Sequence, residues 1–312
     1  MIEFIQFSLP PIMIGVLAGI ACALPGNFLI LRKQALIGDA ISHVVLPGIV
    51  VAFLISGVIS AVPMLLGAAA AALFSVLLIE AIKRYGRIEA GAAMGVVFTT
   101  LFAGGVLLLE RSDTSNVHLD VEHALMGNLE SLIWFQAEGL GSLYDPVALS
   151  ALPEELPRMF FVCLMIVTLT LVFWRWLKIS TFDDNFAQSI GLPTGPIGVG
   201  LVVTAAIAAV AAFDAVGSII VIAMFICPPA AARLLCDNLA GQVRLSLVFA
   251  TLSAILGYVL AGYGPLWLGA QNAVSAAGMI ATVSGILLAI AALYTQRRLA
   301  RRSAALAPLG TD

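Results

Sequence analysis

The chain has 312 residues, of which 61% are hydrophobic and only 11% are charged. Soluble domains carry about 25% charged residues, so this composition excludes a water-soluble globular protein and indicates an integral membrane protein. The formal net charge of -3 decides little, because the placement of charge matters more than its sum in such a protein.

Uncharged stretches long enough to cross a bilayer, about 20 residues each, recur along the chain. The stretch 44–79 is too long for one helix, and Gly57, Ser60 and Pro63 predict a tight turn that divides it into two spans. The sequence GYGPLWLGAQN at 262–272 divides the last stretch in the same way. The stretches that contain the predicted spans are 4–31, 44–79, 91–109, 159–176, 185–213, 215–232 and 245–296.

These stretches predict an all-α fold, a polytopic helical membrane protein with eight or nine transmembrane helices. The number stays open because 185–232 also fits broken helices and the first stretch also fits a partial crossing. The four cysteines lie in or beside apolar segments without metal-site spacing, so we expect small buried side chains rather than disulfides. They are Cys22, Cys163, Cys227 and Cys236.

Basic residues recur between the predicted spans and fix an orientation, because basic loops stay in the cytoplasm. With nine crossings, all of the basic clusters fall on one side. They lie at 32–33, 83–87, 175–178, 233–244 and 297–302. The sequence therefore predicts one transmembrane domain, 1–312, with its N-terminus outside. It also predicts a large, acidic external segment at 110–157 and a cytoplasmic tail at 297–312.

An acid and a histidine stand inside apolar sequence near the start of the second span. Asp39 and His43 lie four residues apart and share one face of a helix. Asp214 is similarly flanked by apolar residues in VAAFDAVGSIIVIAMF. Ionisable residues within spans usually face a protein interior or a water-filled path. Two carboxylates and one imidazole suit a divalent cation such as zinc, manganese or iron(II).

Ordinary structural roles also fit these three residues. Asp39 suits the N-cap of the second span, His43 suits a packing position, and Asp214 suits a turn between two short spans. Sequence spacing alone does not show that the three side chains meet.

The external segment contains a further group of potential ligands at 116–130. These are His118, Asp120, Glu122 and His123. Their spacing fits a metal site, but it fits the solvated face of an amphipathic helix better, because apolar residues recur on the other face.

Several stretches together resemble the membrane-spanning subunits of bacterial manganese, zinc and iron ABC transporters. They are LRKQALIGDAISHVVLPGIVVAFL, DVEHALMGNLESL, STFDDNFAQSIGLP and AAFDAVGSIIVIAMFICPPAAARLL. They occur in the order found in that family, and the resemblance covers nearly the whole chain. One departure is the segment 134–159, which is longer than the corresponding loop of the family and has no role that the sequence reveals.

The resemblance implies a non-enzymatic permease in the bacterial cytoplasmic membrane, embedded in lipid, without a nucleic-acid partner. Such a permease pairs with a second permease subunit, identical or related. Two cytoplasmic ATP-binding subunits drive it, and an extracytoplasmic metal-binding protein supplies it. The sequence has no Walker-type phosphate-binding loop of its own. The metal ion is the transported substrate, and no permanently bound cofactor is expected.

By position, the resemblance assigns Asp39 and His43 to a metal-site pair and Asp214 to its acidic partner. Ser218 occupies a position, one turn after that acid, where some relatives supply a further ligand, although a serine is a weak one. The nitrogen-poor ligand set favours manganese or iron(II) over zinc by a small margin.

The resemblance also assigns the segment 180–193 to a cytoplasmic coupling helix that docks into the ATPase. The local sequence agrees, because two aspartates can cap a short helix at 185–190 and the following glycine can end it. Apolar residues at helical spacing form an edge for a partner's groove. The residues expected to act in coupling are Phe182, Asp183, Asp184, Phe186, Ile190 and Gly191.

Three other functions remain open at this point. An intramembrane aspartyl protease would use Asp39 and Asp214 to activate water, but it has no need of His43. A permease for metal chelates or vitamins would need a wide apolar channel without an inner ionisable cluster. A proton-coupled carrier would work without any ATP-binding partner.

Overall fold

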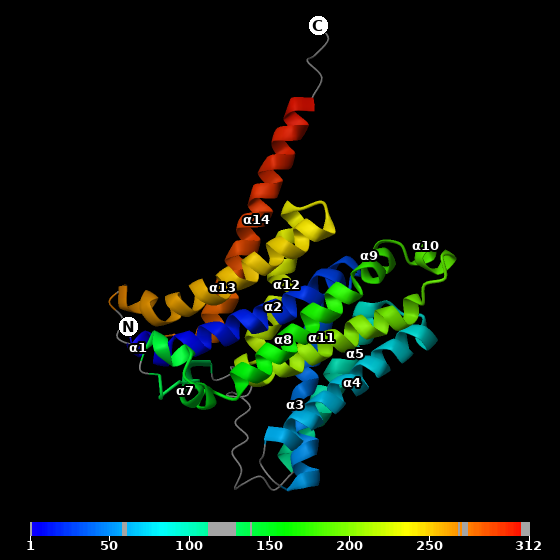
Figure 1. Ribbon diagram of the computed structural model, residues 1–312. Helices are drawn as coiled ribbons and strands as arrows, with labels where there is room; N and C mark the ends of the chain where they lie inside the picture. Colours follow the sequence, from blue (N-terminus) through cyan, green and yellow to red (C-terminus); the bar gives the residue numbers. More distant parts are fainter. Residues whose placement is uncertain are drawn as a thin grey trace.

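The computed structural model describes residues 2–57, 61–111, 129–137, 139–267, 269 and 274–306, which fold mainly into helices (Figure 1). Within this described part, nine segments are long and apolar enough to cross a membrane. They correspond to α1 (Ile2–Phe7) continued by α2 (Leu9–Leu31), α3 (Ile37–Ser56), α4 (Ala61–Gly86), α5 (Ala90–Arg111), α8 (Glu155–Val172), α11 (Thr194–Val216), α12 (Ser218–Leu235), α13 (Leu239–Trp267) and α14 (Ala276–Leu306). The predicted polytopic all-α membrane fold is confirmed, with the higher of the two expected numbers of spans.

Both regions that left the count open are long enough to cross, since the first stretch forms one candidate span, Ile2–Leu31. The region 185–232 contains two separate spanning helices, α11 and α12, which meet at Gly217. Gly217 has a φ of 80°, which favours glycine and breaks the helical path. Gly57, predicted to form a turn, ends α3 in a left-handed conformation with a φ of 66°. Pro63, by contrast, lies inside α4 rather than in the turn.

Helix α2 occupies the centre of one group of helices and packs against α8, α11, α12 and α13 (Figure 1). Small residues allow this close approach, as is common where helices associate in membranes. A Cβ atom at Gly19 would lie 3.3 Å from the Met224 sulfur of α12. On the α13 side, the buried Asn27 amide donates a hydrogen bond of 2.7 Å to the Ser246 hydroxyl.

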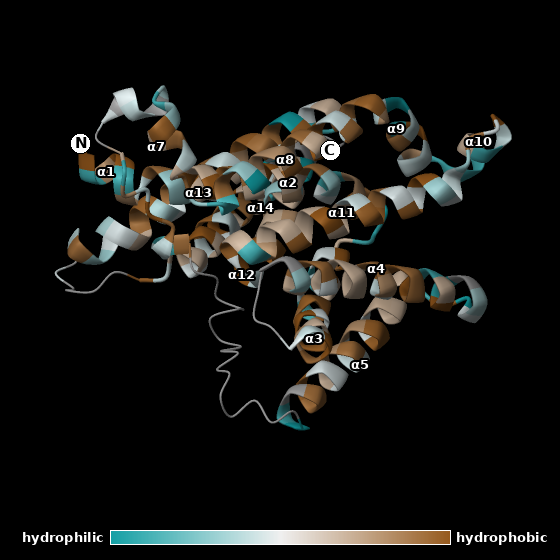
Figure 2. Cartoon of the chain, turned by 60° about the horizontal axis from the view of Figure 1, so that its bottom comes forward, coloured by the Kyte–Doolittle hydropathy of each residue, from teal (hydrophilic) through white to brown (hydrophobic). Residues whose placement is uncertain are grey.

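Helices α3, α4 and α5 pack closely together and form a second, largely apolar group (Figure 2). Helices α11 and α12 join this group to the first one, since both contact α3. The α3–α4 contact is closest at two glycines, where a Cβ atom on Gly48 would lie 2.5 Å from the Gly67 carbonyl oxygen. Gly105 brings α5 equally close to Pro47 of α3.

The start of α3 is fixed by an aromatic side chain of α12. Phe225 is 1% exposed, and Cβ atoms built on Gly26 of α2 and Gly38 of α3 would both collide with it. The close packing of Phe225 against these glycines therefore restrains the first turn of α3, which begins at Ile37, two residues before Asp39. These glycine contacts bring the helices of the apolar core close together around the candidate site.

The long segment 134–159 folds against α1. It contains a short 3-10 helix, η2 (Leu140–Leu143), and α7 (Pro146–Ser150), after η1 (Leu129–Ser131). The buried Trp134 donates from its indole nitrogen to the Ala148 carbonyl at 2.8 Å. Its backbone N–H donates to the Gln6 carbonyl of α1 at 2.9 Å. The amphipathic helix predicted at 116–130 lies mostly outside the described residues, as do all four of its potential ligands, so this helix stays a prediction and the less favoured metal site stays untested.

Enlarging Gly48 tests the α3–α4 contact. We expect Gly48→Ala to lower the thermal unfolding midpoint of the detergent-solubilised protein, because overpacking a close contact costs about 1–3 kcal/mol. Gly95→Ala in α5 is the matched control, since a Cβ atom there meets nothing within 4 Å. Equal midpoints for the two variants would contradict the close contact.

Candidate functional site

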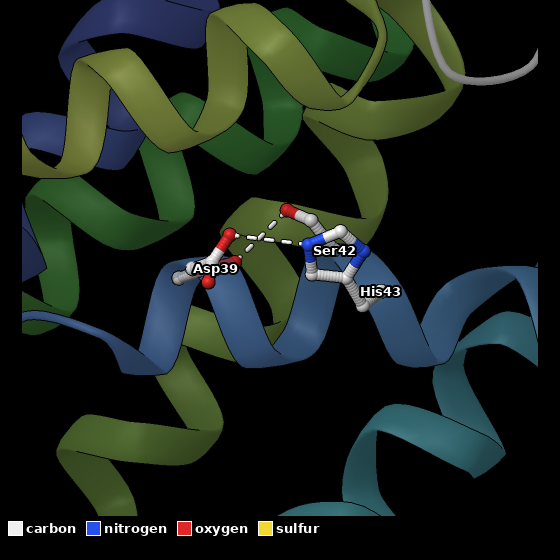
Figure 3. A network of polar contacts seen from close by, with 4 residues as sticks. Asp39, Ser42 and His43 are labelled. Carbon is white, nitrogen blue, oxygen red and sulfur yellow. Dashed lines mark hydrogen bonds and ion pairs between the residues drawn. The ribbon is translucent and has the colours of Figure 1, made fainter. Parts of the chain in front are cut away.

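Asp39 and His43 lie on the first two turns of α3 and face each other (Figure 3). The His43 Nε2 atom is 3.3 Å from the Asp39 Oδ1 atom, and the side chains are 33% and 27% exposed. The N-cap of α3 is Leu36 and Asp39 stands in the first turn, so the N-cap role considered for Asp39 is wrong. Ser42, between them in sequence, donates to the Gly38 carbonyl of its own helix at 2.9 Å.

Two phenylalanines of α5 hold the His43 ring from the other side. The Phe98 ring stacks on the imidazole with centroids 5.5 Å apart, and the Phe102 ring meets it edge-on at 5.5 Å. These phenylalanines are one turn apart on α5, so they form one aromatic surface. His43 therefore both packs and faces an acid, and the packing role and the polar role proposed for it are compatible.

Asp214 lies near the end of α11 and pairs with Arg158 of α8. The Asp214 side chain is 38% exposed and that of Arg158 is 28% exposed. Asp214 has helical geometry, so it is not the turn residue itself; Gly217 takes that place. Throughout the described ranges, no three His, Cys, Asp or Glu side chains gather closely enough to hold a metal ion. The structure thus brings Asp39 and His43 together without adding Asp214, and a metal role for all three stays a prediction.

Ser218 does not have the relation to Asp214 that the resemblance implied. Helix α11 ends at Val216 and Ser218 is the first residue of α12, with Gly217 between them. Ser218 is buried, with 5% of its surface exposed. It therefore does not stand one turn beyond Asp214 on a continuous helix, because Gly217 changes the chain direction first.

Arg158 is the site residue that sequence reasoning missed. It lies one residue beyond the acidic segment 110–157, at the end of the span where the predicted orientation places the outside. Basic residues favour the opposite side of the membrane. An arginine in the first turn of a span at this end was therefore a signal for an acidic partner. No sequence signal indicated the stacking of Phe98 and Phe102 on His43.

The expected coupling segment forms a short helix, α10 (Asp184–Ser189), directly after α9 (Trp174–Phe182). Asp183 caps α10, since its Oδ1 atom accepts the Phe186 N–H at 2.9 Å. Gly191 follows with a φ of 80°. The predicted helix at 185–190 and its cap are confirmed, displaced by one residue.

Helix α10 lies at one end of the molecule (Figure 1). Large apolar side chains are exposed on it and on the residues that flank it, and together they form an apolar edge. Phe182, Phe186 and Ile190 are 54%, 54% and 51% exposed. Three large apolar side chains left half-exposed at a helix end suit a partner protein better than water.

Comparison with known proteins identifies the family. The sequence model described as the ABC 3 transport family matches residues 2–134 and 147–296. The chain belongs to the ABC 3 transport family. The internal part left out of the match, 135–146, falls inside the segment 134–159, which the sequence predicts to be longer than the corresponding loop of the family.

Two relatives and one solved structure illustrate the similarity. The chain is 40% identical over 281 residues to the manganese transport system membrane protein MntD of Bacillus subtilis, covering 90% of each. It is 37% identical over 288 residues to the zinc transport system membrane protein TroD of Treponema pallidum, covering 92% of this chain and 73% of that protein. The structure of PsaBC from Streptococcus pneumoniae in complex with Fab matches 93% of this chain and 92% of that one, with a TM-score of 0.70 and 25% identity. This ABC 3 family member is a transport permease, as the sequence predicted.

The Arg158–Asp214 pair is open to a double-mutant test. We expect Arg158→Gln and Asp214→Asn each to lower the thermal midpoint of the permease, because each leaves one charge without its partner. The double variant should lose less stability than the sum of the losses in the two single variants. We expect this difference, expressed as a free energy of unfolding, to be about 1 kcal/mol. Strictly additive losses would show that the two side chains do not interact in solution.

Proposed function

We propose that this permease is the membrane-spanning subunit of an ATP-driven importer in the bacterial cytoplasmic membrane. Its substrate is a divalent transition metal ion, with manganese favoured, then iron or zinc. The observation that carries the proposal is the partly exposed Asp39–His43 pair within a span that is otherwise apolar.

The pair needs a compensating interaction in that position. An ionised Asp at the centre of a membrane helix costs about 2.5–3.5 kcal/mol on insertion scales, and less near a helix end. The contact of the His43 imidazole with the Asp39 carboxylate offsets part of this cost. A divalent cation offsets more of it, because it brings two positive charges to the same carboxylate. The pair therefore favours a cation that has shed part of its water.

The ligand chemistry narrows the type of ion. Carboxylate oxygen and imidazole nitrogen suit manganese, iron(II) and zinc, whereas the absence of thiolate from the pair gives no preference for soft ions. Two protein ligands leave several coordination positions to water or to further groups. A permease benefits from such incomplete coordination, because the ion must leave again on the other side.

Two further groups are candidates to complete the coordination. Asp214 is one, if metal binding separates it from Arg158 when α11 and α3 move relative to each other. The second permease subunit is the other source, since the Asp39–His43 pair is a third exposed on the single chain. In either arrangement, transport requires that the binding strength differ between two conformations.

Coupling to ATP is assigned to α10. Its apolar edge and capped, rigid start fit a groove on a cytoplasmic ATP-binding subunit, which supplies the hydrolysis that this chain has no motif for. The basic residues at 32–33, 83–87 and 175–178 fall at the same end of the spans, in agreement with a cytoplasmic position. An extracytoplasmic metal-binding protein would deliver the ion at the opposite end.

Substitutions at the pair test the proposed substrate. We expect Asp39→Ala and His43→Ala each to lower the initial rate of Mn²⁺ uptake by about 10-fold or more, because each removes a ligand. Uptake is measured with radioactive Mn²⁺ in cells that lack other importers, at matched expression. Ser42→Ala is the control: it removes a polar group between the two that bonds only within its own helix. Normal uptake by Asp39→Ala, His43→Ala and Asp214→Ala alike would overturn the proposed site.

The role of α10 has a separate test. Phe186→Ser should reduce co-purification of the ATP-binding subunit with the permease, since it removes the centre of the apolar edge. Asn185→Ala is the matched control, because Asn185 is exposed on the same helix. Equal recovery of the ATP-binding subunit with both variants would count against docking at this edge.

A further inference from the structure

The corner between α2 and α3 is tied to the last turn of α9 by one side chain. Arg32, the residue that ends α2, donates from Nη2 to the Ser180 hydroxyl at 2.7 Å and from Nε to the Thr181 hydroxyl at 3.2 Å. The two acceptors lie just before Asp183, the cap of α10. One guanidinium therefore joins the corner that precedes the candidate metal-site helix to the last turn of the helix that precedes the coupling helix.

These two hydrogen bonds form a link between Arg32 and α9, and the Ser180 hydroxyl that accepts one of them is held rigidly. Ser180 is 2% exposed, and its hydroxyl donates to the Trp176 carbonyl at 2.8 Å, which turns its lone pairs toward Arg32. A forked guanidinium that donates to two neighbouring hydroxyls fixes both distance and orientation, unlike a single ammonium contact.

The guanidinium also lies against α11. A Cβ atom on Gly198 would be 3.0 Å from the Arg32 Nη1 atom, so the absence of a side chain at Gly198 makes space for the guanidinium. Burial lowers the pKa of Arg32, and the negative charge of Asp184 at the start of α10 opposes that effect. Arginine remains charged in proteins, so the link persists at physiological pH.

The other side of the link is a short, hydrogen-bonded corner. The Gln34 N–H donates to the Leu29 carbonyl at 2.8 Å, and the Ile37 N–H donates to the Gln34 carbonyl at 3.1 Å. Helix α3 starts at Ile37 and carries Asp39 in its first turn. Because these backbone hydrogen bonds restrain the corner, a displacement of Arg32 also displaces Asp39.

Packing also joins α2 to α9, since the Phe28 and Trp174 rings meet edge-on with centroids 6.0 Å apart, but this packing does not continue beside Arg32. A polar cavity of about 410 Å³ lies beside the link, and Arg32, Gln34, Glu80, Lys83 and Asp184 are among its lining residues. Since side chains interlock poorly across a cavity, the hydrogen bonds of Arg32 carry a larger share of the mechanical connection. The cavity also gives the corner room to move.

We propose that Arg32 is a positioning residue that transmits movement of α10 to the Asp39–His43 pair through Ser180 and Thr181. The inference rests on the proposed function, because it assumes that α10 receives the ATPase and that the pair binds the metal. It adds a defined path between α10 and the pair. Removing the hydrogen bonds of Arg32 should leave both α10 and the pair intact but uncouple their movements.

The experiment measures Mn²⁺ ions transported per ATP hydrolysed by the complete transporter in proteoliposomes. We expect Arg32→Gln to lower this ratio at least about 5-fold, the lower range of typical coupling between sites, while complex assembly and equilibrium Mn²⁺ binding stay within about 2-fold. The double variant Ser180→Ala with Thr181→Val removes the two acceptor hydroxyls and should lower the ratio as Arg32→Gln does. Arg32→Lys should be intermediate. Lys33→Gln, which removes the neighbouring exposed charge, should retain the normal ratio.

Two results would overturn the inference. One is a normal ratio in Arg32→Gln. The other is loss of assembly or Mn²⁺ binding in Arg32→Gln while the Ser180/Thr181 variant keeps a normal ratio, which would reveal an ordinary stabilising role. A wild-type complex that hydrolyses ATP but neither binds nor moves Mn²⁺, Fe²⁺ or Zn²⁺ would instead overturn the proposed function, and the inference with it.

Discussion

An ionisable pair inside a membrane helix must be held and compensated, and the architecture around α3 meets that requirement. Asp39 and His43 compensate each other, and the rings of Phe98 and Phe102 fix the imidazole from the opposite side. The pair stays partly open, so a cation can approach it without unfolding the helix. Restraint together with access to the pair is what the proposed transport role requires.

The position of the pair depends on backbone contacts that only small residues allow. Phe225 lies against Gly26 and Gly38, and Gly48 brings α4 against the middle of α3. Helix α3 is therefore restrained at both its start and its centre. Such tightly packed helices move as units rather than bend, which suits a mechanism in which ATP-driven motion enters at one end.

Arg158 gives Asp214 a partner in this conformation, so the acid has no need of a metal ion here. The exchange of Arg158 for a cation would be a discrete event, since one charge replaces another at the same carboxylate. Occupancy of Asp214 by Arg158 or by metal would then differ between conformations. That difference is what a transporter requires in order to bind its substrate on one side and release it on the other.

Much of the fold could be predicted from the sequence because local rules govern it. The lengths of the apolar stretches predicted the spans, Gly57 predicted a turn, and Asp183 was predicted to cap α10. The site was less accessible, because its contacts join residues far apart in the chain. The i, i+4 spacing placed Asp39 beside His43, but only the packing of α8 on α11 pairs Arg158 with Asp214. Gly217 separates the helix of Asp214 from that of Ser218. This helix break was hard to predict, because apolar residues continue on both sides of it.

The account depends most directly on whether His43 binds the transported ion. Pulsed electron paramagnetic resonance of Mn²⁺ bound to the purified transporter measures this, because a coordinated imidazole nitrogen modulates the electron spin echo. We predict a directly coupled nitrogen in the wild-type protein and its loss in His43→Ala. Bound Mn²⁺ without nitrogen coupling, or coupling that survives in His43→Ala, would contradict the assignment of the Asp39–His43 pair to the metal.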